Sequence, residues 1–346
     1  GALLLPVGRL AMLKVIPRSQ FLSAMSLMSL AGLVGPLIGP TLGGWMVEVT
    51  SWHWIFLINI PMGFLGCLIT FKAMPNVTEP SVKKFDFSGF ILLIIAMVGL
   101  SLGIENFASP HQSLWWSIAL VIAGIFAAIL YAIHAHTHHN ALFRSTLFSN
   151  RIYAIGIVGN FFARLGGNAI PFLIPLMLQV AFGFEPFITG LLMIPTVLGS
   201  LASKPIIRQI IQRFGYRKVL LVNTLLVGAC IASFALSTAE TPIWLRTLHF
   251  FVFGMLNSLQ FVSMNTLTLK DLPQQDASSG NSFLSMIMMV SMSIGVALAG
   301  TLVNLFTAYF GSEQIVTAFH STLIFLGCIN LITAAIFWQI PRHTPV

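Results

Sequence analysis

One arginine lies where it could act on a charged or polar solute inside a membrane. Arg164 stands near the middle of the apolar run 152–180. A charge at that depth is unfavourable by several kcal/mol where lipid surrounds it, so the side chain should face a cavity or pair with carbonyl groups. Arg164 is therefore either a contact for substrate or gate, or a structural residue that ties helix ends together. The sequence leaves both roles open.

Amide side chains in the same half of the chain add polar groups to otherwise apolar segments. Such amides either hydrogen-bond between helices or line a substrate cavity. We treat as candidate cavity residues, together with Arg164, the amides Asn160, Asn168, Gln179, Asn257, Gln260 and Asn265. Arg246, by contrast, closely follows Pro242, and we expect its side chain to reach the outer interface.

Groups that catalyse reactions are nearly absent. All 9 acidic residues fall in loops or near the ends of apolar runs, so none is placed to carry a proton at mid-membrane. The sequence has no Gly-Lys dipeptide of a phosphate-binding loop and neither the HExxH nor the GxSxG motif. We predict a protein that is not an enzyme and has no cofactor and no metal site. The histidine cluster that we interpret as a solvated spacer is His134, His136, His138 and His139.

The elements that would hold these residues are membrane-spanning helices. Of the 346 residues, 57% are hydrophobic and only 8% are charged, against roughly 25% charged in soluble domains. The apolar residues form runs of roughly 20, the length of one bilayer crossing, and lack the short alternating segments of a membrane barrel. We predict an all-α polytopic membrane protein with a partial span at 1–13 and ten complete spans near 21–47, 52–74, 87–105, 114–134, 152–180, 186–203, 217–237, 243–268, 280–308 and 317–340.

The basic residues indicate the topology. The formal net charge is +8, and most of the 17 Lys and Arg residues fall in alternate loops, whereas the opposite loops carry acids and no basic residue. Such a bias marks cytoplasmic loops, so the charge reflects membrane topology rather than nucleic-acid binding. We expect the C-terminus in the cytoplasm, together with the loops at 14–20, 72–86, 136–151, 204–218 and 270–278.

A glycine and proline motif is the most specific pattern in the chain. Residues 32–44 read Gly-Leu-Val-Gly-Pro-Leu-Ile-Gly-Pro-Thr-Leu-Gly-Gly. Small residues at every fourth position let helices approach closely, and prolines bend the helix axis. The segment resembles the antiporter motif of the fifth helix in drug/proton exchangers of the major facilitator superfamily, with Ser26 in place of the first Gly. It implies a gate, or else a packing seam without a gating role, at Gly35, Pro36, Gly39, Pro40, Gly43 and Gly44.

Further stretches resemble the same group. Residues 52–61 resemble the entry to the sixth helix, with His53 where many members have Arg. The segment from Gln179 to 195 is similar to a Gln…Gly…Pro…Gly…Pro hairpin of the group. A later loop resembles the second copy of the cytoplasmic gating motif, but Gln212 replaces the usual Asp, so a charge-locked gate is not implied. The candidate residues of this loop are Arg213, Gly215, Arg217 and Lys218.

The resemblance covers nearly the whole chain and implies the major facilitator fold of the fourteen-helix drug/proton antiporter branch. It implies a partial N-terminal bundle at 1–74, two linking helices with flanking loops at 75–139, and a six-helix C-terminal bundle at 140–346. The implied function is proton-coupled efflux of drugs or other small molecules by alternating access. Export of small metabolites such as organic anions is the alternative, because Arg164 without a nearby acid suits anions or neutral solutes.

The resemblance also implies where the protein works and with what. We expect a monomer in the inner membrane of a bacterium, with a small-molecule substrate and the proton gradient as energy source. Gly1, which is not Met, stands inside an apolar segment, so we expect the chain to begin within a helix. Helices one to three, with the acid that carries the proton, would then precede it.

Overall fold

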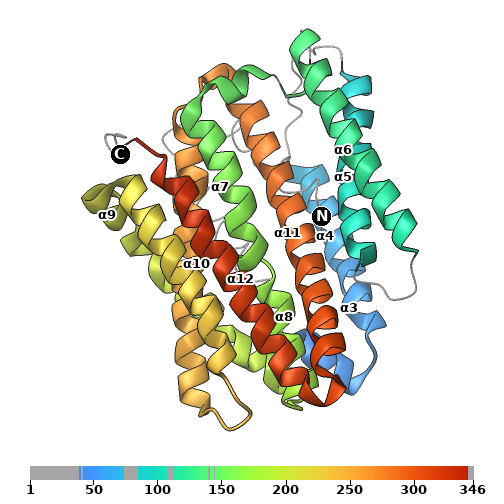
Figure 1. Ribbon diagram of the computed structural model, residues 1–346, viewed down its shortest axis with the longest axis vertical. Coiled ribbons are helices and arrows are strands. Elements are labelled where there is room, and N and C mark those ends of the chain that lie inside the picture. The colour runs from blue at the N-terminus through green and yellow to red at the C-terminus, as the bar shows by residue number, and fades with distance from the viewer. Residues whose placement is uncertain are drawn as a thin grey trace. The chain divides into compact units, whose positions relative to one another are not determined.

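The regular elements of the described chain are all helical. The computed structural model describes residues 39, 42–73, 85–107, 113–138, 141–143 and 145–341. A helical stretch at 42–49 comes first. The α-helices that follow (Figure 1) are α3 (His53–Leu57), α4 (Asn59–Ala73), α5 (Phe87–Phe107), α6 (Leu114–Thr137), α7 (Arg151–Gly167), α8 (Ile170–Leu176), α9 (Pro186–Ser233), α10 (Ile243–Lys270), α11 (Gln274–Phe310) and α12 (Ile315–Trp338). Shorter helical turns are η1 (Ser145–Ser149), η2 (Met177–Ala181), η3 (Phe234–Leu236) and η4 (Ser312–Gln314).

Eight helical segments of the described chain are long and apolar enough to cross a membrane. Hydrocarbon offers no hydrogen-bonding partner to the backbone, so an apolar run of this length is stable there only as a helix. The prediction of an all-α polytopic membrane protein is confirmed. The segment Pro186–Leu236 combines two of the predicted spans. The predicted partial span 1–13 and most of the span 21–47 lie outside the described residues.

The chain forms two compact units. The first comprises the described parts of Gly1–Lys83 together with Phe184–Leu198, and the second comprises those of Lys84–Gly183 and Gly199–Val346. Within the second unit, α7 packs against α10, α11 and α12, while α5 pairs with α6 and also contacts α11 (Figure 1). The helix α7, which carries Asn160 and Arg164, therefore contacts α10, which carries Asn257, Gln260 and Asn265.

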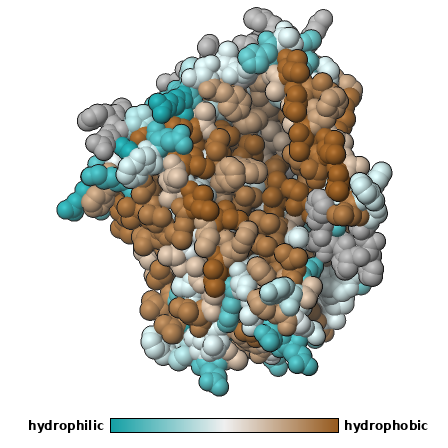
Figure 2. Space-filling model, viewed as in Figure 1, coloured by the Kyte–Doolittle hydropathy of each residue, from teal (hydrophilic) through white to brown (hydrophobic). Residues whose placement is uncertain are grey.

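The second unit has a buried apolar core and an apolar outer surface. Leu220 of α9, Leu267 of α10 and Phe337 of α12 are fully buried and belong to one core cluster. Large side chains such as Val222 and Ile332 are instead exposed. Figure 2 shows hydrophobic side chains covering the middle of the visible face and hydrophilic ones gathering toward the helix ends. An exposed apolar belt of this kind is what a bilayer covers.

Glycines bring α5 and α6 into close contact. A Cβ atom on Gly99 would lie 2.8 Å from the carbonyl oxygen of Leu120 and 3.0 Å from Gly124. A Cβ on Gly124 would in turn lie 2.8 Å from the backbone nitrogen of Leu100. Membrane helices associate largely through such close backbone packing, so these glycines fix α5 and α6 as a pair.

Two predicted loops are shorter than the sequence indicates. The expected loop at 204–218 is helical up to Phe214, and the only break in α9 is Gly215, whose φ of 74° and ψ of 156° are non-helical. The helix continues because Ile207 and Ile211, one turn apart, are buried in the core while Arg208 between them is exposed. The expected loop at 270–278 ends at Pro273, after which α11 begins.

Candidate substrate cavity and gating residues

Arg164 is buried among polar side chains in the last turn of α7. Only 6% of the residue is exposed. Its Nε donates a hydrogen bond of 3.1 Å to the Oδ1 of Asn160, and an Nη donates one of 3.3 Å to the Oδ1 of Asn265 on α10. The guanidinium also lies over the ring of Phe261, 4.5 Å from its centre. Among the described residues, the hydrogen bonds of this side chain thus go to amide oxygens of α7 and α10.

Asn160 links this charge to the neighbouring helix. Its Nδ2 donates to the carbonyl oxygen of Gly156 at 3.0 Å and to the Oγ1 of Thr268 on α10 at 3.2 Å. The Thr268 hydroxyl donates to the carbonyl of Met264 at 2.7 Å. The asparagine oxygen is therefore left to accept from Arg164, and the chain of bonds crosses from α7 to α10.

A small cavity lies beside Arg164. Its volume is about 20 Å³, enough for little more than a water molecule. The polar side chains that line it are Arg164, Asn168, Asn257 and Gln260, and the rest of the wall is apolar residues and a glycine. Together with the bonded Asn160 and Asn265, the structure gathers five of the six predicted amides around one arginine. The sixth, Gln179, is exposed on the π-helical turn η2 and does not line this cavity.

Two polar residues of α9 extend the cluster and were not among the candidates. The Oε1 of Gln260 accepts from the Nδ2 of Asn223 at 2.7 Å, and its Nε2 donates to the Oγ1 of Thr224 at 2.6 Å. Asn223 also donates to the carbonyl of Leu256 at 3.0 Å. A polar pair inside the apolar run 217–237 is the sequence signal that could have indicated them.

The antiporter motif lies only partly within the described residues. Gly35, Pro36 and Pro40 fall outside them. At Gly39 and Gly43 the described neighbours leave space for a Cβ atom, whereas a Cβ on Gly44 would lie 2.7 Å from the carbonyl oxygen of Pro186.

A hydrogen bond accompanies this close approach in the first unit. One residue past Pro186, the backbone N–H of Phe187 donates to the Oε1 of Glu48 at 2.9 Å. In the described part of the motif, the close backbone contact is therefore between Gly44 and the start of α9.

The residues of the predicted gating loop surround the break in α9. Gly215 needs a backbone conformation that side-chain-bearing residues rarely adopt. Arg213 lies over the ring of Phe214 at 5.6 Å, and Arg217 over the ring of Trp338 at 5.2 Å. Lys218 is exposed.

Arg246 is buried at the start of α10. Only 3% of it is exposed, and the expectation that it reaches the outer interface stays a prediction. Its guanidinium turns back on the loop before α10 and donates to the carbonyls of Thr238, Ala239 and Thr241. Arg246 thus pairs with carbonyl groups that no helix satisfies.

A family comparison now identifies the architecture. Residues 1–88 and 156–346 match the family model described as Major Facilitator Superfamily. The chain belongs to the major facilitator superfamily. It is a multi-pass membrane transporter, and not an enzyme. The match includes every candidate site residue named above and leaves out residues 89–155, which contain most of α5, all of α6 and the turn η1.

Relatives within the superfamily are similar over almost the whole chain. A protein of Escherichia coli O127:H6 named "Putative multidrug resistance protein MdtD" is 46% identical over 99% of this chain and 74% of the relative. A protein of the same name from Shigella boydii serotype 18 is 45% identical over the same shares. The resemblance to drug exporters of the superfamily is therefore confirmed.

An unpredicted ion pair joins His134, in the stretch that the superfamily match leaves out, to Asp86, near the end of the first matched segment. The Nε2 of His134 on α6 lies 2.9 and 3.0 Å from the two carboxylate oxygens of Asp86, just before α5. Asp86 also accepts from the backbone N–H groups of Gly89 at 2.9 Å and Leu142 at 3.4 Å. The interpretation of the histidine cluster as a solvated spacer is thus wrong for His134.

The environment of Asp86 favours its charged form. Burial raises the pKa of Asp86, but hydrogen bonds from Gly89 and His134 and the charge of His134 outweigh it, so that the pKa lies below the ordinary 3.8. The ionised carboxylate therefore joins three segments of the chain: the start of α5, the end of α6 and the residues that lead to η1.

Proposed function

We propose that the protein exports drugs or other small molecules from the cell by proton-coupled alternating access. The observation that carries this proposal is the 45–46% identity, over 99% of the chain, to relatives named for multidrug resistance. A buried polar cluster between α7, α9 and α10 supports it, because transporters of this superfamily bind solutes near the bilayer midplane between helices.

Efflux from drug-sensitive cells tests this proposal. Cells that lack their major exporters would express the protein and be loaded with a neutral fluorescent dye. We expect faster dye loss than in cells carrying an empty vector, and a return to the slower rate when a protonophore collapses the proton gradient. Equal dye loss with and without the protein, across a panel of neutral and cationic drugs, would contradict drug export.

Organic anions are a second candidate class of substrate, favoured by the contacts of Arg164. The described residues give its guanidinium two neutral amide partners and no carboxylate. A buried cation without a counter-ion attracts an anion, and its planar fork can bind a carboxylate through two hydrogen bonds.

Two substitutions of Arg164 distinguish these substrate classes. Arg164→Gln should nearly abolish export of a labelled organic acid while sparing a neutral dye, and Arg164→Lys should weaken export of the acid because an ammonium lacks the fork. Arg208→Gln, which removes an exposed charge from α9, is the matched control. Equal loss of both substrates with a large fall in melting temperature would refute an anion site.

The proton-binding group of this mechanism is an acid outside the described spans. Described acids lie at segment ends: Glu105 in the last turns of α5, Asp271 just after α10 and Asp276 in the first turn of α11. Carboxylates at the ends of the spans remain hydrated and are not placed to exchange protons with a mid-membrane cavity. We infer that the carrier is none of these described acids.

The domain arrangement and topology complete the proposal. The N-terminal bundle would end near 74, the linking helices would occupy 75–139, and the C-terminal bundle 140–346; the superfamily match, which skips 89–155, supports this division. Cytoplasmic basic loops and a cytoplasmic C-terminus fit the positive-inside bias, and we propose that the protein works as a monomer. Impermeant thiol reagents should label a single cysteine at 213 only after the membrane is opened. Labelling of intact cells would overturn the orientation.

A further inference from the structure

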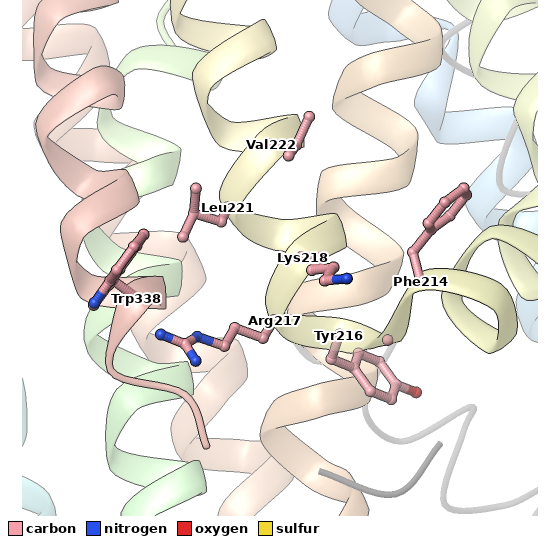
Figure 3. A pocket seen from close by; sticks show the side chains of 8 residues that line it. Phe214, Tyr216, Arg217, Lys218, Leu221, Val222 and Trp338 are labelled. Carbon is pink, nitrogen blue, oxygen red and sulfur yellow. The ribbon is translucent and has the colours of Figure 1, made fainter. Parts of the chain in front are cut away.

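A pocket opens where α9 breaks at Gly215. Its volume is about 380 Å³. The wall combines residues on both sides of the break with one residue from the end of α12, and its members are Phe214, Gly215, Tyr216, Arg217, Lys218, Leu221, Val222 and Trp338. Figure 3 shows Arg217 reaching toward Trp338 while Phe214 lies on the other side of Lys218.

The pocket carries two positive charges that the described residues do not neutralise. Arg217 lies over the ring of Trp338, 5.2 Å from its centre, and is half-buried, while Lys218 is exposed. No described carboxylate forms an ion pair with either side chain; the ion pair found in the described chain joins His134 to Asp86. A cationic pocket of this kind favours an anionic ligand.

The remaining wall of the pocket is apolar and faces outward. Leu221 and Val222 continue along α9 from the charged residues, one turn further into the membrane-spanning segment. Val222 is 54% exposed and Trp338 is 62% exposed. Tryptophan at the end of a membrane helix is typical of the headgroup region of a bilayer. The pocket therefore offers cations at the interface and an apolar surface directly beneath them.

We propose that this pocket binds an anionic phospholipid, with its phosphate between Arg217 and Lys218 and the first methylene groups of its chains along Leu221 and Val222. The charges recognise the phosphate through charge-assisted hydrogen bonds, and the indole ring of Trp338 covers the glycerol region. Basic pockets between membrane helices are suited to anionic headgroups. A free phosphate ion would match the charges but leave the apolar wall without a partner.

Lipid binding to the purified protein tests the proposal. The protein in neutral detergent would be titrated with phosphatidylglycerol and, separately, with phosphatidylcholine, and bound lipid would be counted by native mass spectrometry. The test variant is Arg217→Gln with Lys218→Gln. The matched control is Arg151→Gln with Arg208→Gln, which removes the same charge from two exposed positions. Inorganic phosphate would be added as a soluble competitor.

The proposal predicts tighter binding of phosphatidylglycerol than of phosphatidylcholine and little competition by millimolar phosphate. The test variant should lose about 30-fold in affinity for phosphatidylglycerol, because each basic residue near a membrane surface contributes a factor of roughly five. The control variant should lose less than threefold, because its two positions lie outside the pocket. Trp338→Ala should weaken binding without any change of charge. Equal binding of both lipids, equal loss in the two double variants, or displacement by phosphate would each overturn it.

Discussion

Arg164 and Asn160 lie one turn apart on α7, and the Nε of the arginine donates a 3.1 Å hydrogen bond to the Oδ1 of the asparagine. The amide nitrogen of Asn160 is occupied by Gly156 and Thr268, so its oxygen is held toward the guanidinium. Asn160 thus positions Arg164. This arginine is the only charged side chain among the described residues that surround the cavity.

Replacement of Asn160 should destabilise the protein. Asn160→Ala leaves the buried Nε of Arg164 without a partner, which should lower the free energy of unfolding by about 1–3 kcal/mol and reduce export. Asn257→Ala, which changes a half-buried amide of the same cavity, should have a smaller effect on stability. Melting temperatures in detergent measure both. Equal stability of the Asn160→Ala variant and the unmodified protein would show that the asparagine does not hold Arg164.

Two neighbouring glycines of the motif, Gly43 and Gly44, should differ in their tolerance of a side chain. A Cβ on Gly44 would press on the carbonyl oxygen of Pro186 at 2.7 Å, whereas the described residues leave space at Gly43. Gly44→Ala should therefore destabilise the protein by about 1–3 kcal/mol through overpacking, and Gly43→Ala should not. Thermal unfolding of the two variants compares them directly. A Gly44→Ala protein that melts like Gly43→Ala would argue against a close contact here.

Gly215 should be hard to replace because of its backbone conformation. With φ of 74° and ψ of 156° it occupies a region that is essentially restricted to glycine. We expect Gly215→Ala to cost about 1–3 kcal/mol of stability. Gly300→Ala is the control, because this glycine of α11 has open space around it, and alanine there should be neutral or stabilising. The idea fails if both variants have the same melting temperature.

The ion pair between Asp86 and His134 should make the stability of the fold depend on pH. The folded-state pKa of Asp86 lies below the ordinary 3.8, so the carboxylate stabilises the fold at pH values above 3.8, and this stabilisation is lost as the pH falls through the folded-state pKa. Asp86→Asn should lower the melting temperature at pH 7 and have a diminishing effect below pH 3.8. Melting curves between pH 7 and pH 3 measure the difference. A difference that stays constant with pH would point to packing and not to charge.

The sequence predicts the spans and part of the site because both depend on local patterns. An apolar run long enough to cross a bilayer has one stable form there, so α5, α6, α10 and α12 lie where the runs indicate. Arg164 and Asn160 are four residues apart and must share a helix face. Asn257, Gln260 and Asn265 recur along α10 with nearly helical spacing, and the structure places them around Arg164.

Contacts between distant segments leave no such pattern. Asp86 and His134 are 48 residues apart, and no spacing rule indicates their pairing. Gln179 has the same side-chain chemistry as the clustered amides, but the π-helical turn η2 turns it outward. The helix beyond Ser203 was missed because its charged residues suggested a loop, whereas the buried Ile207 and Ile211 hold it as an amphipathic extension.

Export by Arg164 variants is the measurement that tests the central claim, a solute site built on this buried charge. Cells expressing the protein would be loaded with a labelled organic acid and a neutral dye, and the loss of each would be followed for Arg164→Gln and for the control Arg208→Gln. The account predicts at least a tenfold slower export of one or both substrates for Arg164→Gln, at a melting temperature close to that of the control. Export of both substrates at the unmodified rate by a stable Arg164→Gln protein would contradict it.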